Sequence, residues 1–310
     1  GKGVGAEIVN SPVQGTYLGR AGDPNIEEIV QQSDLVISVG AIMSDSNFAI
    51  NAETIAGRSA MFIQHREVNI GHYSYNGIPL PIVLNGLLTA AKPKPWHATP
   101  IERPSTSNGE SATATNKPNV IAPMMIADAL NACFESFGRY PVASDVGDCL
   151  FVSQGLTSAA VVAPGYYASM GFGVPAGLGI QATTGRRAIV LVGDGAFQMT
   201  GMELGHCRRY NFTPIVVVLN NQGWEMIRAF APDSKAADLG HWPFAKMADL
   251  LGGTGISVST PEQLSAALNN AFLDDTQFYL IDVQIPKGLK TPSLAHFAEV
   301  LTAKQNMARQ

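Results

Sequence analysis

The chain has 310 residues, enough for two domains, and its 46% apolar and 15% charged residues are typical of a soluble globular protein. A net charge of −5 gives no support to nucleic-acid binding, and no apolar run reaches the ~18 residues needed to span a membrane. The three cysteines are widely spaced and form neither a disulfide framework nor a zinc pattern. No secretory signal is visible, so we expect a cytoplasmic protein.

Residues 1–91 are predicted to form a first α/β unit. The pattern indicates an amphipathic helix, a buried strand ending in a glycine, two further strands and a second helix, at residues 24–32, 34–40, 61–64, 67–70 and 81–91. These elements make up part of a doubly wound parallel-sheet domain. Since the chain begins at Gly1 without a methionine, we expect the domain to be truncated at its start.

The composition then changes over residues 92–119, which are rich in Pro, Ser, Thr and Asn. Such a run cannot bury enough apolar surface to fold compactly. We interpret it as an extended linker on the surface, and we place the second domain at residues 120–310.

Helices and apolar strands alternate through this second domain, which predicts another doubly wound parallel sheet. The strands are expected at residues 140–145, 188–193, 214–220 and 278–285. The helices are expected at residues 124–134, 166–181, 201–210, 224–230, 242–251, 261–272 and 293–307.

Two of the predicted strands end in small polar residues, Gly-Asp-Gly at 193–195 and Asn-Asn at 220–221. Open α/β sheets bind ligands at the carboxyl ends of their strands, so Asp194 and Asn221 should meet at one edge. Oxygen ligands of this kind suit Mg²⁺ or Ca²⁺ carrying a phosphate, with the carbonyl of Gly223 as a third protein ligand. The alternative is a strand-to-helix turn with a solvated aspartate.

The phosphate itself should be bound by backbone groups at the start of the following helix. The N–H groups of Gly195 and Ala196 lie there, where the helix dipole favours anions. Gly195 also has no Cβ, so the backbone can approach a ligand closely.

Together, the two motifs resemble the signature of thiamine diphosphate enzymes. The likeness extends over most of the chain, in residues 15–19, 35–48, 144–151, 163–176, 193–205 and 220–230. It is closest to the C-terminal portion of a thiamine diphosphate-dependent 2-oxo acid decarboxylase of the indolepyruvate or phenylpyruvate type. This resemblance implies a Rossmann-like middle domain without a cofactor, followed by the diphosphate-binding domain.

The resemblance also assigns roles to individual residues. Asp194, Asn221 and the Gly223 carbonyl are expected to hold Mg²⁺. Met170, next to Ser169, matches the bulky apolar residue that props thiamine diphosphate into its bent conformation. The residues expected to contact the cofactor are Asp148, Cys149, Ser169, Met170, Gly195 and Ala196.

One position departs from the pyruvate decarboxylases, which carry a glutamate where this chain has Ile227. The phenylpyruvate-type enzymes also have an aliphatic residue there and use an aspartate of the middle domain as the acid. Asp45 matches that aspartate, so we expect it to be catalytic, although it could equally cap a loop. Met226 and Ile227 predict a large apolar pocket suited to an aryl or indolyl group.

The implied reaction is the non-oxidative decarboxylation of an aromatic 2-oxo acid, phenylpyruvate or indolepyruvate, to the aldehyde. The family's catalytic glutamate belongs to a pyrimidine-binding domain that this sequence does not contain. We therefore expect a missing N-terminal part or another chain to supply it, in a homo-oligomer, and this chain alone to be inactive. Two alternatives stay open, a carboligase resembling acetohydroxyacid synthase and an inactive cofactor-binding module.

Overall fold

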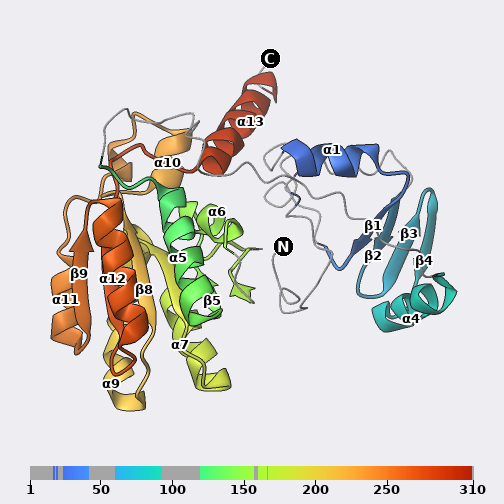
Figure 1. Cartoon of the computed structure of the whole chain (residues 1–310). Coiled ribbons are helices and arrows are strands. Elements are labelled where there is room, and N and C mark those ends of the chain that lie inside the picture. The colour runs from blue at the N-terminus through green and yellow to red at the C-terminus, as the bar shows by residue number, and fades with distance from the viewer. Residues whose placement is uncertain are drawn as a thin grey trace. The chain divides into compact units, whose positions relative to one another are not determined.

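The computed structural model describes residues 17, 19, 24–41, 60–92, 119–156, 160–165 and 167–308. The chain divides into two compact units, which consist mainly of Pro12–Arg103 and of Pro104–Ala298. Figure 1 shows the helices and strands of both units. The predicted linker falls largely outside the described residues.

The first unit contains a four-stranded sheet in the order β1-β2-β3-β4. Its elements are α1 (Pro24–Gln32), β1 (Val36–Val39), β2 (Ala60–Ile63), β3 (Glu67–Ile70), β4 (Tyr73–Asn76) and α4 (Leu80–Ala90). The predicted helices and the first three strands are confirmed, whereas β4 was not predicted. The predicted burial of the first strand is wrong, because Ile37 and Val39 of β1 are exposed.

The expectation of a parallel sheet is wrong for this unit, because the sheet is mixed. Strands β1 and β2 are parallel, but β3 runs antiparallel to both β2 and β4. The reason lies in the connections: only Gly71 and His72 separate β3 from β4, and Gly71 has a positive φ of 55°. A turn this short can join only antiparallel strands, since a parallel pair needs a long crossover.

The second unit contains a six-stranded sheet in the order β6-β5-β7-β8-β10-β9, and every pair in it is parallel. This confirms the predicted doubly wound parallel sheet. Strands β6 and β9 were not predicted. The strands are β5 (Val142–Ser144), β6 (Val161–Val162), β7 (Ile189–Gly193), β8 (Ile215–Asn220), β9 (Thr254–Val258) and β10 (Tyr279–Gln284).

Helices connect these strands. They are α5 (Pro123–Phe137), α6 (Asp148–Gln154), α7 (Gly173–Thr184), α8 (Asp194–Thr200), the 3-10 helix η1 (Gly201–His206), α9 (Cys207–Tyr210), α10 (Glu225–Phe230), η2 (Lys235–Ala237), α11 (Phe244–Leu251), α12 (Pro261–Leu273) and α13 (Pro292–Ala308). Helix α7 begins at Gly173 rather than at residue 166, because Ala168 and Gly171 adopt positive φ angles that interrupt a helix. Helix α6, which begins at Asp148, was not predicted.

Alternate residues of the central strands face two separate hydrophobic clusters, one on each side of the sheet. On β7, Ile189 and Leu191 belong to one cluster, and Val190 and Val192 belong to the other. Helices α5 and α12 cover the first face, as Figure 1 shows. Helices α8 and α11 contribute to the second. Burial on both faces explains why the strands are nearly continuous apolar runs.

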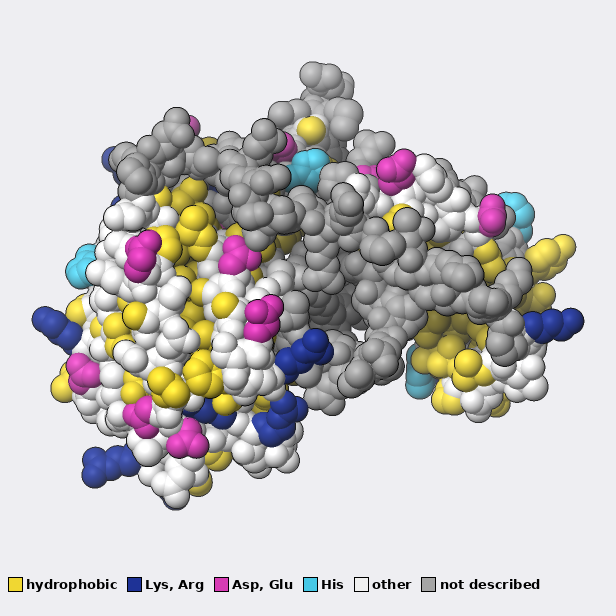
Figure 2. All heavy atoms as spheres, in the orientation of Figure 1, with side chains coloured by type: hydrophobic (Ala, Val, Ile, Leu, Met, Phe, Trp, Pro, Cys, Tyr) yellow, Lys and Arg dark blue, Asp and Glu magenta, His cyan; other side chains and the backbone are white. Residues whose placement is uncertain are grey.

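Charged side chains are unevenly placed on the face of the second unit that Figure 2 shows. Among the described residues, acidic side chains are spread between apolar ones, whereas several Lys and Arg side chains lie close together at its lower right edge.

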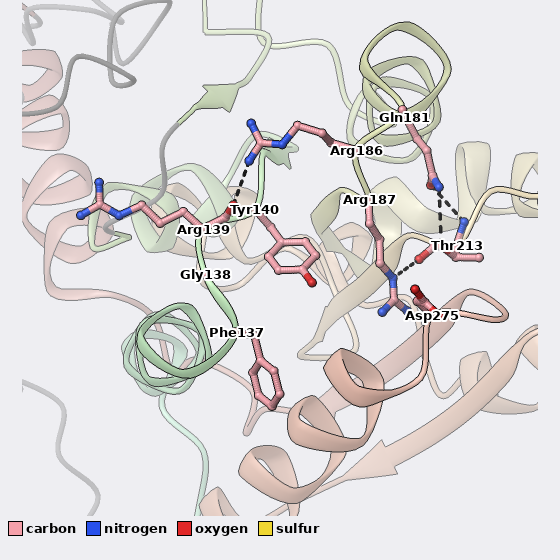
Figure 3. A pocket seen from close by; sticks show the side chains of 10 residues that line it. Phe137, Gly138, Arg139, Tyr140, Gln181, Arg186, Arg187, Thr213 and Asp275 are labelled. Atoms are coloured by element: carbon pink, nitrogen blue, oxygen red, sulfur yellow. Dashed lines mark hydrogen bonds between the residues drawn. The ribbon is translucent and has the colours of Figure 1, made fainter.

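Arg187 ties together the amino-terminal ends of three strands. It is 9% exposed and donates hydrogen bonds to the carbonyls of Thr213, Ala271 (2.6 Å) and Gln277 (3.3 Å). The same edge holds a cavity of about 430 Å³, which Figure 3 shows between the loop from α5 to β5 and Arg187. Asp194 and Asn221 follow the opposite ends of the strands, so this cavity lies apart from them.

We expect the change Arg187→Met to destabilise the second unit. It leaves three carbonyls without their charged donor, at a cost on the order of 3 kcal/mol in the free energy of unfolding. Urea denaturation measures the loss. The exposed neighbour Arg186 is the control, and Arg186→Met should change stability by only about 0.5 kcal/mol. Equal losses in the two variants would contradict a structural role for Arg187.

Candidate functional site

The structure brings the two polar motifs together at the carboxyl edge of the six-stranded sheet. Strands β7 and β8 are neighbours, with Gly193 paired to Leu219. The Asp194 carboxylate accepts the N–H of Gly223 at 2.9 Å on Oδ2 and the N–H of Gly195 at 2.7 Å on Oδ1. One buried carboxylate therefore joins the segment after β7 to the turn after β8.

The two consecutive asparagines have different environments. Asn220 donates from Nδ2 to Asp282 on β10 at 2.8 Å, and its Oδ1 accepts the N–H of Gln222 at 3.3 Å. Asn221 is 7% exposed, and its Oδ1 has no hydrogen-bond partner among the described residues. A buried amide oxygen without a donor is costly, which points to a ligand at Asn221.

The turn that carries Gly223 is fixed by a neighbouring segment. Trp224 donates its N–H to the Ala237 carbonyl at 2.8 Å, and Leu239 donates its N–H to the Gln222 carbonyl at 3.0 Å. The Gly223 carbonyl takes part in neither bond. A Cβ at Gly223 would overlap the Arg228 guanidinium and the Ala237 carbonyl, so no larger residue fits. The turn therefore holds this carbonyl in a defined position.

These groups fit a hard divalent cation. Burial raises the pKa of Asp194 to about 6, and an adjacent cation would offset that cost by favouring the charged carboxylate. The described residues include no cluster of three or more His, Cys, Asp or Glu side chains that could hold a metal. A metal here would depend on the amide oxygen of Asn221 and the carbonyl of Gly223, and oxygen ligands favour Mg²⁺ or Ca²⁺ over zinc.

At the predicted diphosphate end, two side chains are already committed to the protein. The Asp148 carboxylate accepts hydrogen bonds from Thr291, and Cys149 is buried in the core. Burial, followed by the negative charges of Asp145, Asp148 and Asp194, raises the pKa of the Cys149 thiol well above its usual range. We expect both residues to meet a diphosphate through their backbone groups.

The other predicted phosphate-binding residues lie at the start of α8. The N–H of Gly195 donates to Asp194, so this donor serves the carboxylate in the structure. A Cβ at Gly195 would overlap the Trp224 ring, which packs directly on the backbone. Ala196 is buried beside it.

Met170 lies in a loop that Asp145 holds in place, and the sequence had not identified Asp145. The fully buried Asp145 carboxylate accepts the N–H groups of Gly171 at 3.3 Å and of Gly173 at 2.8 Å. The Thr200 hydroxyl, at the end of α8, donates to the Gly171 carbonyl at 2.8 Å. The loop is thus tied to two elements at the edge of the sheet. In the sequence, only the position of Asp145 at the end of a predicted strand could have indicated this role.

The remaining predicted site residues differ in how far their side chains are buried. Ser169 and Met170 are exposed, Met226 is half-buried, and Ile227 is 43% exposed. Glu225 does not face the same way as Ile227, because it is buried and forms an ion pair with Arg228 at 2.5 Å. Asp45 lies outside the described residues, so its predicted role is untested.

The match to a family model agrees with this geometry. Residues 145–283 match the C-terminal TPP binding domain of thiamine pyrophosphate enzymes. Residues 145–283 of the second unit are therefore a C-terminal TPP-binding domain of the thiamine pyrophosphate enzyme type. The family inferred from the sequence is confirmed.

The individual relatives that the chain resembles are named decarboxylases. The chain is 43% identical to the indole-3-pyruvate decarboxylase of Azospirillum brasilense over 302 residues, which are 96% of this chain and 54% of that protein. It is 24% identical to the pyruvate decarboxylase of Hanseniaspora uvarum over 308 residues, 94% of this chain and 54% of that protein. The alpha-keto-acid decarboxylase of Mycolicibacterium paratuberculosis is 23% identical over 291 residues, 90% of this chain and 50% of that protein.

The chain spans about half the length of these curated relatives. Within the part of the chain that the structure describes, no helix is both long and apolar enough to cross a membrane.

The change Gly223→Ala should disturb the turn that follows β8. Its Cβ would meet the Arg228 guanidinium and a backbone carbonyl, and overpacking of this kind costs about 1–3 kcal/mol. Gly193→Ala is the matched control, because its Cβ would meet nothing within 4 Å and its φ of −74° is allowed for alanine. We expect urea unfolding without cofactor to show a loss in the first variant only.

The buried aspartates should also give stability an unusual pH dependence. The folded protein holds a proton on Asp194 up to about pH 6, whereas the unfolded chain loses it near pH 3.8. Between these values the folded state binds more protons, so rising pH removes stability. Metal-free protein should therefore lose stability relative to Asp194→Asn as the pH rises from about 4 to about 6.

Urea unfolding in a chelating buffer, repeated across this range, tests the expectation. The variant Asp233→Asn removes a surface carboxylate and serves as the control. A difference between wild type and Asp194→Asn that stays constant with pH would contradict the raised pKa.

Proposed function

We propose that this chain contributes the Mg²⁺- and diphosphate-binding half of a thiamine diphosphate-dependent 2-oxo acid decarboxylase. The observation that carries the proposal is the buried Asn221 oxygen, which lacks a donor and lies in the turn that Asp194 holds through Gly223. The family match to a TPP-binding domain over residues 145–283 supports the identity of the ligand.

In this proposal, Asp194, Asn221 and the Gly223 carbonyl hold Mg²⁺ and so anchor the diphosphate. The backbone at Gly195 and Ala196 lies beside the phosphate oxygens. Thiamine diphosphate, when bound, supplies the electron sink that decarboxylation of a 2-oxo acid requires. The protein provides the charge, the shape and the exclusion of water around it.

We further propose that the substrate is an aromatic 2-oxo acid, indolepyruvate or phenylpyruvate. Ile227 presents an exposed apolar side chain close to the metal-binding turn, and Met226 lies beside it half-buried. An apolar wall of this kind suits an aryl or indolyl group better than a charged residue would. The name of the Azospirillum relative supports the same substrate class. Asp45 is proposed to approach the substrate carboxylate.

The site needs a partner that covers it. Large apolar side chains are exposed on the loop of Met170 and on the helices after β7, namely Tyr167, Met170, Met199 and Met202. We propose that a pyrimidine-binding domain, from the same polypeptide or from another copy in a dimer or tetramer, packs against this side. That domain would supply the catalytic glutamate.

We expect the full-length protein to bind thiamine diphosphate in the presence of Mg²⁺. Asp194→Ala should weaken this binding by at least about a hundred-fold. Mutating residues that only orient metal ligands already lowers metal affinity about 10–100-fold. Asp233→Ala on the surface is the control. Calorimetry measures the affinity, and metal-independent binding would contradict the proposed site.

With phenylpyruvate or indolepyruvate as substrate, the products should be CO₂ and the aldehyde. An Asp45→Ala variant should turn over more slowly, since the proposed acid is missing. Chromatography of the products decides between reaction types. Acyloin products would instead indicate a carboligase, and unchanged turnover in Asp45→Ala would remove that residue from the mechanism.

A further inference from the structure

The start of helix α13 is bonded directly to the start of helix α6. Thr291 donates its N–H to Asp148 Oδ2 at 3.0 Å and its hydroxyl to Asp148 Oδ1 at 2.5 Å. Thr291 is fully buried, Asp148 is 8% exposed, and the two residues are 143 positions apart in the sequence. A single residue therefore occupies both oxygens of this carboxylate.

The same threonine also caps α13. Its Oγ1 accepts the N–H of Leu294 at 3.1 Å, and its carbonyl accepts the N–H of Ala295 at 3.0 Å. A hydroxyl has one proton to donate and can still accept, so both bonds of Oγ1 can form together. The first turn of α13 and the orientation of Asp148 consequently depend on one hydroxyl group.

The residues just before Thr291 reach a second element of the site. Gly288 donates its N–H to Glu225 Oε2 at 3.3 Å, and the Lys290 ammonium lies 3.6 Å from Glu225 Oε1. Glu225 begins α10, two residues after Gly223. Residues 287–291, here called the 287–291 segment, thus contact both the helix after β5 and the helix after β8.

Asp148 lies at the same edge of the sheet as the metal-binding groups. It follows β5, which is the neighbour of β7 in the sheet. If the cofactor binds as proposed, an aspartate at this edge faces a diphosphate of like charge. Bonds to both of its oxygens from Thr291 would hold the carboxylate away from that anion.

We propose that Thr291 is a positioning residue of the cofactor site, which acts by orienting Asp148. This inference rests on the proposed function, because it needs thiamine diphosphate at this edge. The 287–291 segment then supports the cofactor site, although no residue of the segment is assigned to contact the cofactor. Helix α13 is then coupled to occupancy of the site.

The test is Thr291→Val in the full-length protein, which removes the hydroxyl but keeps the side-chain shape and the N–H. We expect the affinity for thiamine diphosphate with Mg²⁺, measured by calorimetry, to fall about ten-fold, roughly the value of one charge-assisted hydrogen bond. Thr291→Ser keeps the hydroxyl and should restore the affinity. A wild-type affinity in Thr291→Val would overturn the proposal.

Thr260 provides a matched control. It also precedes a proline and caps its helix, α12, by accepting the N–H of Gln263 at 3.3 Å, but it bonds no residue of the site. Thr260→Val should lower the thermal midpoint and leave the affinity unchanged. An equal loss of affinity in Thr260→Val would show that general destabilisation, not positioning, explains the effect.

A double-mutant cycle with Asp148→Asn shows whether Thr291 acts through Asp148. If it does, adding Thr291→Val to Asp148→Asn changes the affinity far less than it changes that of the wild type. Fully additive effects would overturn the assignment.

If Thr291→Val does not fold, hydrogen exchange of backbone amides in the wild-type protein replaces it. Added cofactor should protect the amides of Leu294 and Ala295 but not that of Leu264 in α12. Equal protection of all three amides would overturn the coupling between α13 and the cofactor site.

These outcomes separate the positioning role from the proposed function. A wild type that does not bind the cofactor, or binds it independently of Asp194, refutes the proposed function itself. A wild type that binds through Asp194 while Thr291→Val binds equally well refutes only the role of Thr291.

Discussion

The site depends on one carboxylate, that of Asp194. It accepts the N–H of Gly195, just after β7, and the N–H of Gly223, in the turn after β8. These bonds exist only because β7 and β8 are parallel neighbours that end at the same level. Together with the bonds of Trp224 and Leu239, the carboxylate holds the turn after β8, in which the Asn221 oxygen has no donor among the described residues. The preference for an oxygen-binding cation follows from that arrangement.

Polar residues at this edge separate into two groups, according to whether the protein satisfies them. Asn220, Asp145 and Asp148 have protein donors or acceptors and hold loops in position. Asn221 Oδ1 has no partner among the described residues, and neither do Gln198 Nε2, Glu225 Oε1 and Gln284 Nε2. Of these four groups only Asn221 is assigned to the metal by the resemblance, and its free oxygen supports a ligand there.

The sequence predicted the central sheet well because its strands are buried on both faces and therefore read as continuous apolar runs. It also predicted that Asp194 and the Asn-Asn pair would meet, since this follows from strand direction alone. Short edge strands such as β6 give too little pattern to detect, with only Val161 and Val162 in the strand. The mixed first sheet was not predicted, because the short turn at Gly71, which can join only antiparallel strands, was not recognised in the sequence.

Contacts between distant segments could not be predicted in the same way. Nothing near Asp148 in the sequence indicates that Thr291 will bond it, because that contact is created by the folding of everything between them. The same is true of the loop of Met170, whose conformation depends on bonds to Asp145 through Gly171. Local pattern identifies the residues of such a site, while their orientation is decided by tertiary structure.

The strand order has a consequence for biosynthesis. Strand β10 lies between β8 and the edge strand β9, so β9 cannot join the sheet until residues 279–284 have left the ribosome. Asp282, the partner that holds Asn220, arrives with that strand. The metal-binding turn is therefore translated before the strand that supports it. During synthesis the nascent chain carries apolar strand edges that only the last part of the domain can cover.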